Sequence, residues 1–145
     1  MNIIFIVEDN GVQQEIVNIP VVQNIEPVNC ETMDEEFNTI NGKTLNLIGG
    51  KGLRNFSFSS FFPSKRYSFV SFFNFQSPKY YINFFEKYRD ARVPLRIIII
   101  DKYRVVLNML CRYNFTYSFR DKAGDVPYTL DIKEYILPGE VDNNV

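Results

Sequence analysis

Alternation of apolar and polar residues, with a period of two, dominates this chain and predicts a β-rich fold. The longest example runs from Val105 to Phe119, where every odd position is apolar or aromatic and most even positions are polar. Because successive side chains of a strand point to opposite faces, this pattern predicts one long strand. The turn signal DKAGD (121–125) and a second alternating run, YTLDIKEYI (128–136), follow it. Together the two runs predict a large hairpin.

Shorter runs predict further strands on both sides of this hairpin. In LRNFSFSS (53–60), Phe56 and Phe58 share one face and are expected in the core. Glycine-containing turns are expected at NGK (41–43) and at GGKG (49–52), where glycine supplies a positive φ. The acidic segment ETMDEE (31–36) reads as a solvated loop or short turn. The other expected strands are IIFIV (3–7), QEIVNIPVV (14–22), TLNLI (44–48), SFVSFFNF (68–75) and LRIIII (95–100).

One segment has helical periodicity. Ser77 is suited to cap the first amide groups, and Pro78 suits the first helical position. Pro94 ends the helix, because the residue before a proline is driven toward an extended conformation. The apolar stripe of this helix, at spacings i, i+3, i+4 and i+7, consists of Tyr81, Phe84, Phe85 and Tyr88.

These elements predict an α+β, β-rich fold: a twisted antiparallel sheet or small barrel with one packed α-helix. The length of 145 residues suits one domain, which we expect over residues 1–137, followed by a flexible tail at 138–145. The short apolar N-terminal run has no basic segment or cleavage site and is too short to span a bilayer, so it reads as a strand.

Composition narrows the chemistry. The chain has no histidine and a formal net charge of −1, which removes histidine-based catalysis and any strong global attraction to nucleic acid. Cys30 and Cys111 are expected to be free thiols in a reducing compartment. GKT (42–44) lacks the preceding glycine of a phosphate loop, since Phe37 occupies that position. Carboxylates are present, but no pair stands out for acid–base catalysis, so we expect no enzyme, cofactor or metal site.

Phenylalanine is concentrated between residues 49 and 75, interleaved with serine. Core packing explains Phe56 and Phe58. It explains less well the density of rings that follows, because a domain of this size cannot easily hide them all from water. Aromatic residues are enriched at interface cores, so some of these rings are expected against another chain. Stacking on bases or sugars is the alternative interpretation.

Three motifs resemble one known family. They are G-x-x-G-x-R-x-x-x-x-S-S-F-F-P (residues 49–63), a basic-proline-hydrophobic step into a strand (92–100), and GD-x-x-YTL-x-x-KEY (124–135). The set is similar to the LysM-containing tail proteins in the baseplates of contractile phage tails, PBSX-type prophages and R-type bacteriocins. It covers roughly residues 35–136. The chain departs from the family pattern after KEY, where a LysM module is usual and this chain stops at Val145.

The resemblance implies a tail-tube-like domain that sits around the hub, where tube meets baseplate. It implies a structural subunit of the virion or tail-like particle, assembled in the bacterial cytoplasm. Expected partners are tube, hub and wedge proteins and further copies of this chain, six by analogy with the tail, with no nucleic acid or membrane partner. Expected interface residues are Arg54, Phe61, Phe62, Pro63, Arg66, Tyr67, Phe72, Phe73, Arg120, Asp121 and Asp125.

Two other functions stay open from the sequence. A carbohydrate- or cell-wall-binding module would use exposed Phe and Tyr rings, such as Tyr67, Tyr80 or Tyr81, beside carboxylates in a groove. A small hydrolase would need a pocket with paired carboxylates.

Overall fold

The fold is built around one antiparallel sheet of seven strands. The computed structural model describes residues 1–9, 12–65, 67 and 76–138. The strand order is β2-β1-β7-β8-β9-β6-β3, with β2 and β3 at the edges. The strands are β1 (Asn2–Asp9), β2 (Val12–Asn18), β3 (Asn29–Thr32), β6 (Lys51–Phe62), β7 (Leu95–Asp101), β8 (Arg104–Tyr117) and β9 (Val126–Glu134). The predicted β-rich α+β class is confirmed, and of the two architectures left open the sheet is the correct one, because it does not close into a barrel.

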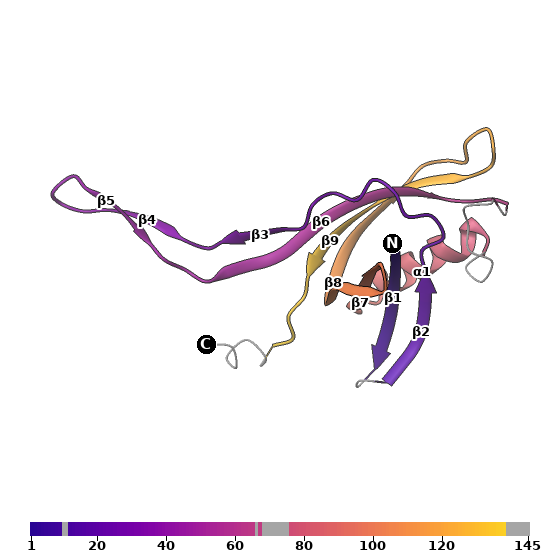
Figure 1. The fold of residues 1–145 in the computed structure, drawn as a ribbon, viewed down its shortest axis with the longest axis horizontal. Helices are drawn as coiled ribbons and strands as arrows, with labels where there is room; N and C mark the ends of the chain where they lie inside the picture. Colours follow the sequence, from indigo (N-terminus) through magenta and orange to yellow (C-terminus); the bar gives the residue numbers. More distant parts are fainter. Residues whose placement is uncertain (10–11, 66, 68–75, 139–145) are drawn as a thin grey trace.

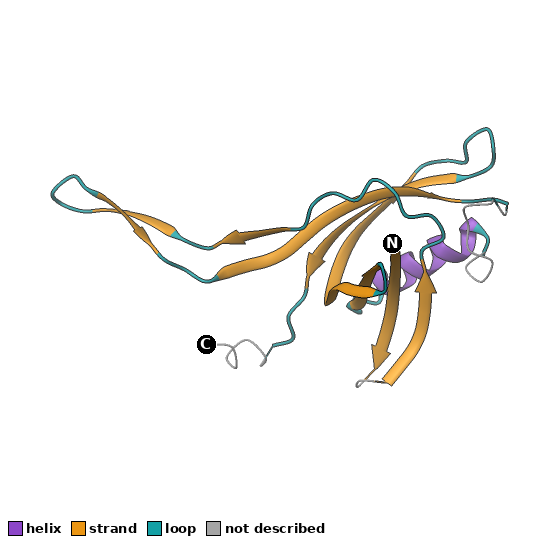
Figure 2. Ribbon diagram, viewed as in Figure 1, coloured by secondary structure: helices purple, strands orange, loops and turns teal. Residues whose placement is uncertain are grey.

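The single described helix, α1 (Pro78–Asp90), packs against β8 on one face of the sheet (Figure 2). The predicted stripe is confirmed: Tyr81, Phe84 and Phe85 are buried, and Tyr88 is partly buried against the core. Ser77 is the N-cap residue, but its side chain makes no capping hydrogen bond. The helix is instead held by its apolar face, as is usual for short helices in proteins.

Aromatic rings fill the space between α1 and the sheet. Phe62 lies stacked between Tyr81 and Tyr128, with ring centroids 4.9 and 3.9 Å away. Phe85 contacts Phe5 edge-on at 5.1 Å. The buried Tyr113 hydroxyl donates to the Phe85 carbonyl oxygen over 2.6 Å, which satisfies a polar atom inside the core. Offset and edge-on contacts of this kind add stability beyond the area they bury.

The predicted long hairpin is also confirmed. Strands β8 and β9 pair from Cys111↔Glu134 to Tyr117↔Tyr128. Alternate β8 residues from Leu107 to Phe115 are buried, as are Tyr128, Leu130 and Ile132 on β9. Val105, Tyr117 and Phe119 belong to the same alternation, yet they are exposed because the ends of β8 extend past the core. The predicted strand at 68–75 and most of the predicted flexible tail, residues 139–145, lie outside the described residues.

A narrow arm projects from this body, away from α1 (Figure 1). It consists of β3, the first part of β6, and a separate two-stranded sheet of β4 (Glu35–Asn38) and β5 (Thr44–Leu47). The predicted turn at NGK is confirmed, and Gly42 has a φ of +79°. The loop prediction for ETMDEE was wrong, because most of this segment pairs with strands β6 and β5.

The turn predicted at GGKG was wrong as well. Lys51 and Gly52 already belong to β6, and positive φ among the described glycines occurs only at Gly42 and Gly124. Glycine is needed at position 49 for a different reason. A Cβ atom there would overlap the backbone carbonyl of Met33, where the two sides of the arm approach each other. Gly49 therefore permits a close backbone approach rather than a reversal of the chain.

Candidate interaction surfaces

The predicted interface loop at the end of β6 is mostly turned inward. Phe62 and Pro63 are fully buried in the chain, so the interface role expected for them is corrected: Phe62 belongs to the aromatic core. Phe61, on the opposite side of the strand, is half-buried and meets Tyr67 edge-on at 6.4 Å. The alternation of β6 explains the difference, since neighbouring positions point to opposite faces. Arg66, Phe72 and Phe73 lie outside the described residues.

Asp125 holds the end of β6 against the β8–β9 connection. Its buried carboxylate accepts hydrogen bonds from the Ser64 backbone N–H (2.8 Å), the Ser64 hydroxyl (3.1 Å) and the Tyr67 hydroxyl (2.8 Å). Burial alone would raise the pKa of Asp125, but the bonds from Ser64 and Tyr67 outweigh it and the pKa is lowered. This carboxylate is thus engaged within the chain rather than offered to a neighbour.

Asp121 organises the same turn. One of its carboxylate oxygens accepts from the backbone N–H groups of Ala123 (2.9 Å) and Asp125 (3.0 Å). Gly124 completes the turn with a φ of +86°. Arg120 is exposed. Arg54, in contrast, forms a 2.9 Å ion pair with Glu134 of its own chain. Of the predicted set, then, Arg120 and Asp121 are exposed, and Phe61, Tyr67 and Arg54 are partly exposed.

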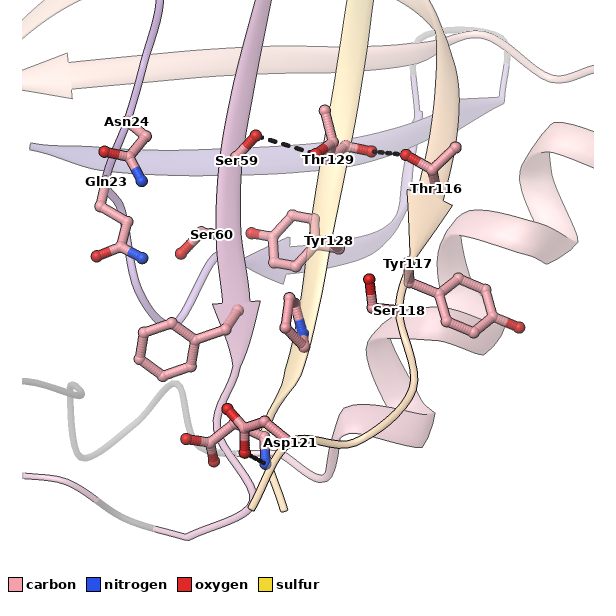
Figure 3. Close-up of a pocket in the computed structure, with 13 residues that line it drawn as sticks. Gln23, Asn24, Ser59, Ser60, Thr116, Tyr117, Ser118, Asp121, Tyr128 and Thr129 are labelled. Atoms are coloured by element: carbon pink, nitrogen blue, oxygen red, sulfur yellow. Dashed lines mark hydrogen bonds between the residues drawn. The ribbon is translucent and has the colours of Figure 1, made fainter. Parts of the chain in front are cut away.

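A polar hollow of about 490 Å³ lies beside β6, β9 and the end of β8 (Figure 3). Hydroxyl and amide side chains line it, and two of them are joined by a 2.9 Å hydrogen bond between Ser59 and Thr129. The buried Tyr128 hydroxyl faces Ser60, yet the Ser60 hydroxyl donates to the Val21 carbonyl (2.7 Å). Among the described residues the Tyr128 hydroxyl has no hydrogen-bond partner. The labelled polar residues around the hollow are Gln23, Asn24, Ser59, Ser60, Thr116, Ser118, Asp121, Tyr128 and Thr129.

Three aromatic residues, Phe61, Tyr117 and Tyr128, are among those that line this hollow. The Tyr117 ring points away from it, toward α1, and its hydroxyl donates to Glu86 over 3.0 Å (Figure 3). Tyr81, one of the rings considered for sugar stacking, is buried under the helix. Tyr80 is exposed but lies on α1, outside the lining of the hollow. The hollow can therefore form hydrogen bonds to a ligand but offers few rings for stacking.

The arm carries an apolar face that the sequence analysis did not assign. The register Phe37↔Leu45 and Glu35↔Leu47 places these four side chains on one face of the β4–β5 ribbon. The opposite face is polar and consists of Glu36, Asn38, Thr44 and Asn46. Phe37, Leu45 and Leu47 are 54%, 47% and 50% exposed. The alternation in TLNLI was visible in the sequence, but the missing information was that no described helix or sheet packs on this ribbon.

A second exposed apolar group lies at the β7–β8 corner. Tyr103, Val105 and Val106 are all strongly exposed there. Lys102 and Tyr103 form the two-residue turn with φ values of +48° and +67°. Such turns favour asparagine and glycine, because other residues are strained at positive φ. The neighbouring backbone of β8 is also open on one side, since its described pairing with β9 begins only at Cys111.

The described residues include no cluster of three or more histidine, cysteine, aspartate or glutamate side chains that could hold a metal ion. Within the same residues, no helix is long and apolar enough to cross a membrane. Asp121 and Asp125 both line the polar hollow, where both oxygens of Asp125 and one oxygen of Asp121 accept hydrogen bonds from backbone N–H or hydroxyl groups.

Comparison with known proteins gives one distant relative. The chain is 27% identical over 119 residues to an uncharacterised Bacillus subtilis (strain 168) protein, YqbP. The match covers 81% of this chain and 53% of YqbP, so this chain spans about half the length of its relative. No protein-family model matches the chain. The similarity therefore covers most of the chain but assigns no family.

Proposed function

We propose that this chain is a structural subunit of the baseplate or tail hub of a contractile phage tail or a phage tail-like particle. The observation that carries the proposal is the projecting arm with its exposed apolar face. A contiguous set of exposed apolar side chains on a thin projection is typical of a surface that another protein covers. The resemblance of the three sequence motifs to tail proteins names the kind of assembly.

Other features support a role in assembly rather than catalysis. Among the described residues the carboxylates with perturbed pKa values, Asp125 and Glu134, are explained by hydrogen bonds that hold strands and turns together. The strands of the arm expose one apolar face and one polar face, which suits recognition by shape and charge. The similarity to YqbP is consistent with this role but carries no function by itself.

In this proposal the partners are tube, hub and wedge proteins together with further copies of the chain, arranged around the tail axis. A six-fold ring follows by analogy with the tail. The particle, assembled in the bacterial cytoplasm, is the expected location. No cofactor or catalytic residue has a part in the proposal.

The test is co-purification with the tube and hub proteins encoded beside this chain. One variant changes the apolar face of the arm, with Phe37, Leu45 and Leu47 all replaced by Ser. The matched control changes the polar face of the same ribbon, with Glu36→Gln and Asn46→Ser. We expect the native chain and the control to hold their partners and the apolar-face variant to lose them. A native chain that binds neither tube nor hub protein contradicts the proposal.

A second candidate function, carbohydrate binding, is favoured by the polar hollow beside Ser59 and Thr129. Its hydroxyl and amide groups resemble those that hydrogen-bond sugars, although the Tyr117 ring points elsewhere. Calorimetric titration with soluble cell-wall oligosaccharides tests it. Binding that is lost in Ser59→Val combined with Asn24→Ala, and kept in the arm variant, favours this function over assembly. If none of the oligosaccharides gives a heat of binding, the carbohydrate-binding function is ruled out.

A further inference from the structure

We infer that the apolar face of the arm docks on the β7–β8 corner of a second copy of this chain. The arm face consists of Glu35, Phe37, Leu45 and Leu47, and the corner consists of Lys102, Tyr103, Arg104, Val105 and Val106. The inference deepens the assembly role proposed above and rests on it, because it names one partner and the surface that this partner contributes.

The arm face needs a cover. A two-stranded ribbon is marginally stable in water unless one face packs against something. Here Phe37 and Leu45 lie directly across from each other, and both are about half exposed, so the described part of their own chain does not cover them. The polar face is different. The Thr44 hydroxyl donates to the Asn38 side-chain oxygen over 3.0 Å, and the polar groups of this face are well suited to contact with water. The ribbon thus has a polar face that suits water and an apolar face that is left exposed to water.

The corner offers a surface of matching chemistry. Tyr103 and Val105 are exposed on a tight hairpin, and the open edge of β8 leaves room for an approaching strand. Two non-glycine residues at positive φ are a costly way to build such a turn. A large exposed ring in this strained position contributes nothing visible to the packing of its own chain. Burial of this ring against a neighbouring chain accounts for its exposed position.

Charge complementarity favours this corner as the surface that receives the arm. Glu35 lies on the apolar face of the arm, whereas Lys102 and Arg104 flank the corner, where Asp101 is paired with Arg104 across the turn. Opposite charges around an apolar contact fix its register and exclude other partners.

The contact joins two different surfaces of the same chain. One copy that receives an arm still has a free arm of its own, so association continues beyond the dimer unless a ring closes. A self-associating species larger than two copies is therefore expected, rather than a symmetric pair.

The experiment is sedimentation velocity on the full chain over a range of concentrations, with charge reversal on each side. Glu35→Lys and Arg104→Glu each should weaken self-association roughly tenfold, and the double variant should recover most of it. Glu36→Lys, on the polar face of the arm, and Arg120→Glu, beside the exposed Phe119, are the matched controls and should associate like the native chain. All of these side chains are exposed, and circular dichroism verifies that each variant is folded.

Three results overturn the inference: a native chain that stays monomeric at every concentration, single reversals that associate like the native chain, or a double variant no better than the singles. Stronger loss in Arg120→Glu than in Arg104→Glu also overturns it. The assembly role is judged separately, by capture of tube and hub proteins. A chain that captures those proteins but fails the charge-reversal test keeps its proposed function and loses only this contact.

Discussion

Arg54 and Glu134 meet twice at the root of the arm. The Arg54 guanidinium donates to one carboxylate oxygen of Glu134 over 2.9 Å, and the Arg54 backbone N–H donates to the other over 3.0 Å. Strand β9 ends at Glu134, whereas β6 extends beyond it into the arm. The contact between Arg54 and Glu134 therefore lies at the end of the β6–β9 pairing, where the arm leaves the body of the fold. The hydrogen bond from Arg54 lowers the pKa of Glu134 below its ordinary value.

Glu134→Gln should lower the free energy of unfolding by about 1 kcal/mol at neutral pH, because a charge-assisted double contact becomes a neutral one. The pKa of Glu134 is lower in the folded state than in the unfolded state, so its contribution is present above the ordinary pKa of about 4 and is lost as pH falls through the folded pKa. Urea unfolding at pH 7 and pH 3 should show the difference from the native chain shrinking in acid.

The control for this variant is Asp90→Asn, which breaks the Arg89–Asp90 pair on the exposed end of α1. Exposed pairs contribute little, so its unfolding free energy should stay close to the native value at both pH values. Equal destabilisation by the two substitutions would mean that the arm root is no more than an ordinary surface contact.

Phe62→Ala should destabilise the chain by about 3–5 kcal/mol, because it empties the space between Tyr81 and Tyr128 in a closely packed core. Phe119→Ala removes the same ring from an exposed position and should change stability by less than about 0.5 kcal/mol. Thermal unfolding measures both. A small loss of stability in Phe62→Ala would return Phe62 to the set of interface candidates.

The two thiols should differ in reactivity. Cys30 is exposed on the arm, whereas Cys111 is buried in β8, where burial raises the pKa of its thiol to about 12. Because the thiolate is the reactive form, Cys111 is protected by both access and charge. A colorimetric thiol assay should count one fast thiol in the folded chain and two in denaturant. Two fast-reacting thiols in the absence of denaturant would contradict the burial of Cys111.

Tyr103→Gly should stabilise the isolated chain and weaken its self-association. Glycine relieves the strain of a positive φ, for a gain of about 1 kcal/mol in unfolding free energy. The same change removes the ring proposed to lie under the arm of a second copy. Tyr103→Phe is the control, since it keeps both strain and ring. Chemical unfolding and sedimentation of the two variants separate the effects, and unchanged association in Tyr103→Gly removes the ring from the contact.

Strong periodicity made the body of this fold predictable. The long β8 strand, the helix stripe and the burial of Phe56 and Phe58 all follow from side chains that repeat with a period of two or 3.6 residues over many positions. The choice between barrel and open sheet did not follow. It depends on whether edge strands such as β2 and β3 meet, and these are separated by pairings that the local pattern does not encode.

The candidate surfaces were harder to predict because they depend on which strands have a face that no other element packs against. Phe62 and Phe37 are both phenylalanines in alternating runs, yet one lies under α1 and the other on a ribbon that extends beyond the sheet. The acidic segment 31–36 was misread for a related reason. Its charges suggested solvent exposure, which is correct, but exposed strands in a narrow arm carry the same composition as a loop.

The order of strands also governs when this chain can fold. Strand β1 pairs with β7, so Ile4 meets Ile98, and β6 waits for β9, with Phe58 paired to Leu130. Strands β7 and β9 must therefore be synthesised before β1 and β6 can pair with them, and contacts so distant in sequence form slowly. Until then the isoleucine-rich β1 exposes an unpaired edge. Slow, late folding and aggregation of C-terminally truncated fragments are the consequences for anyone who expresses this protein.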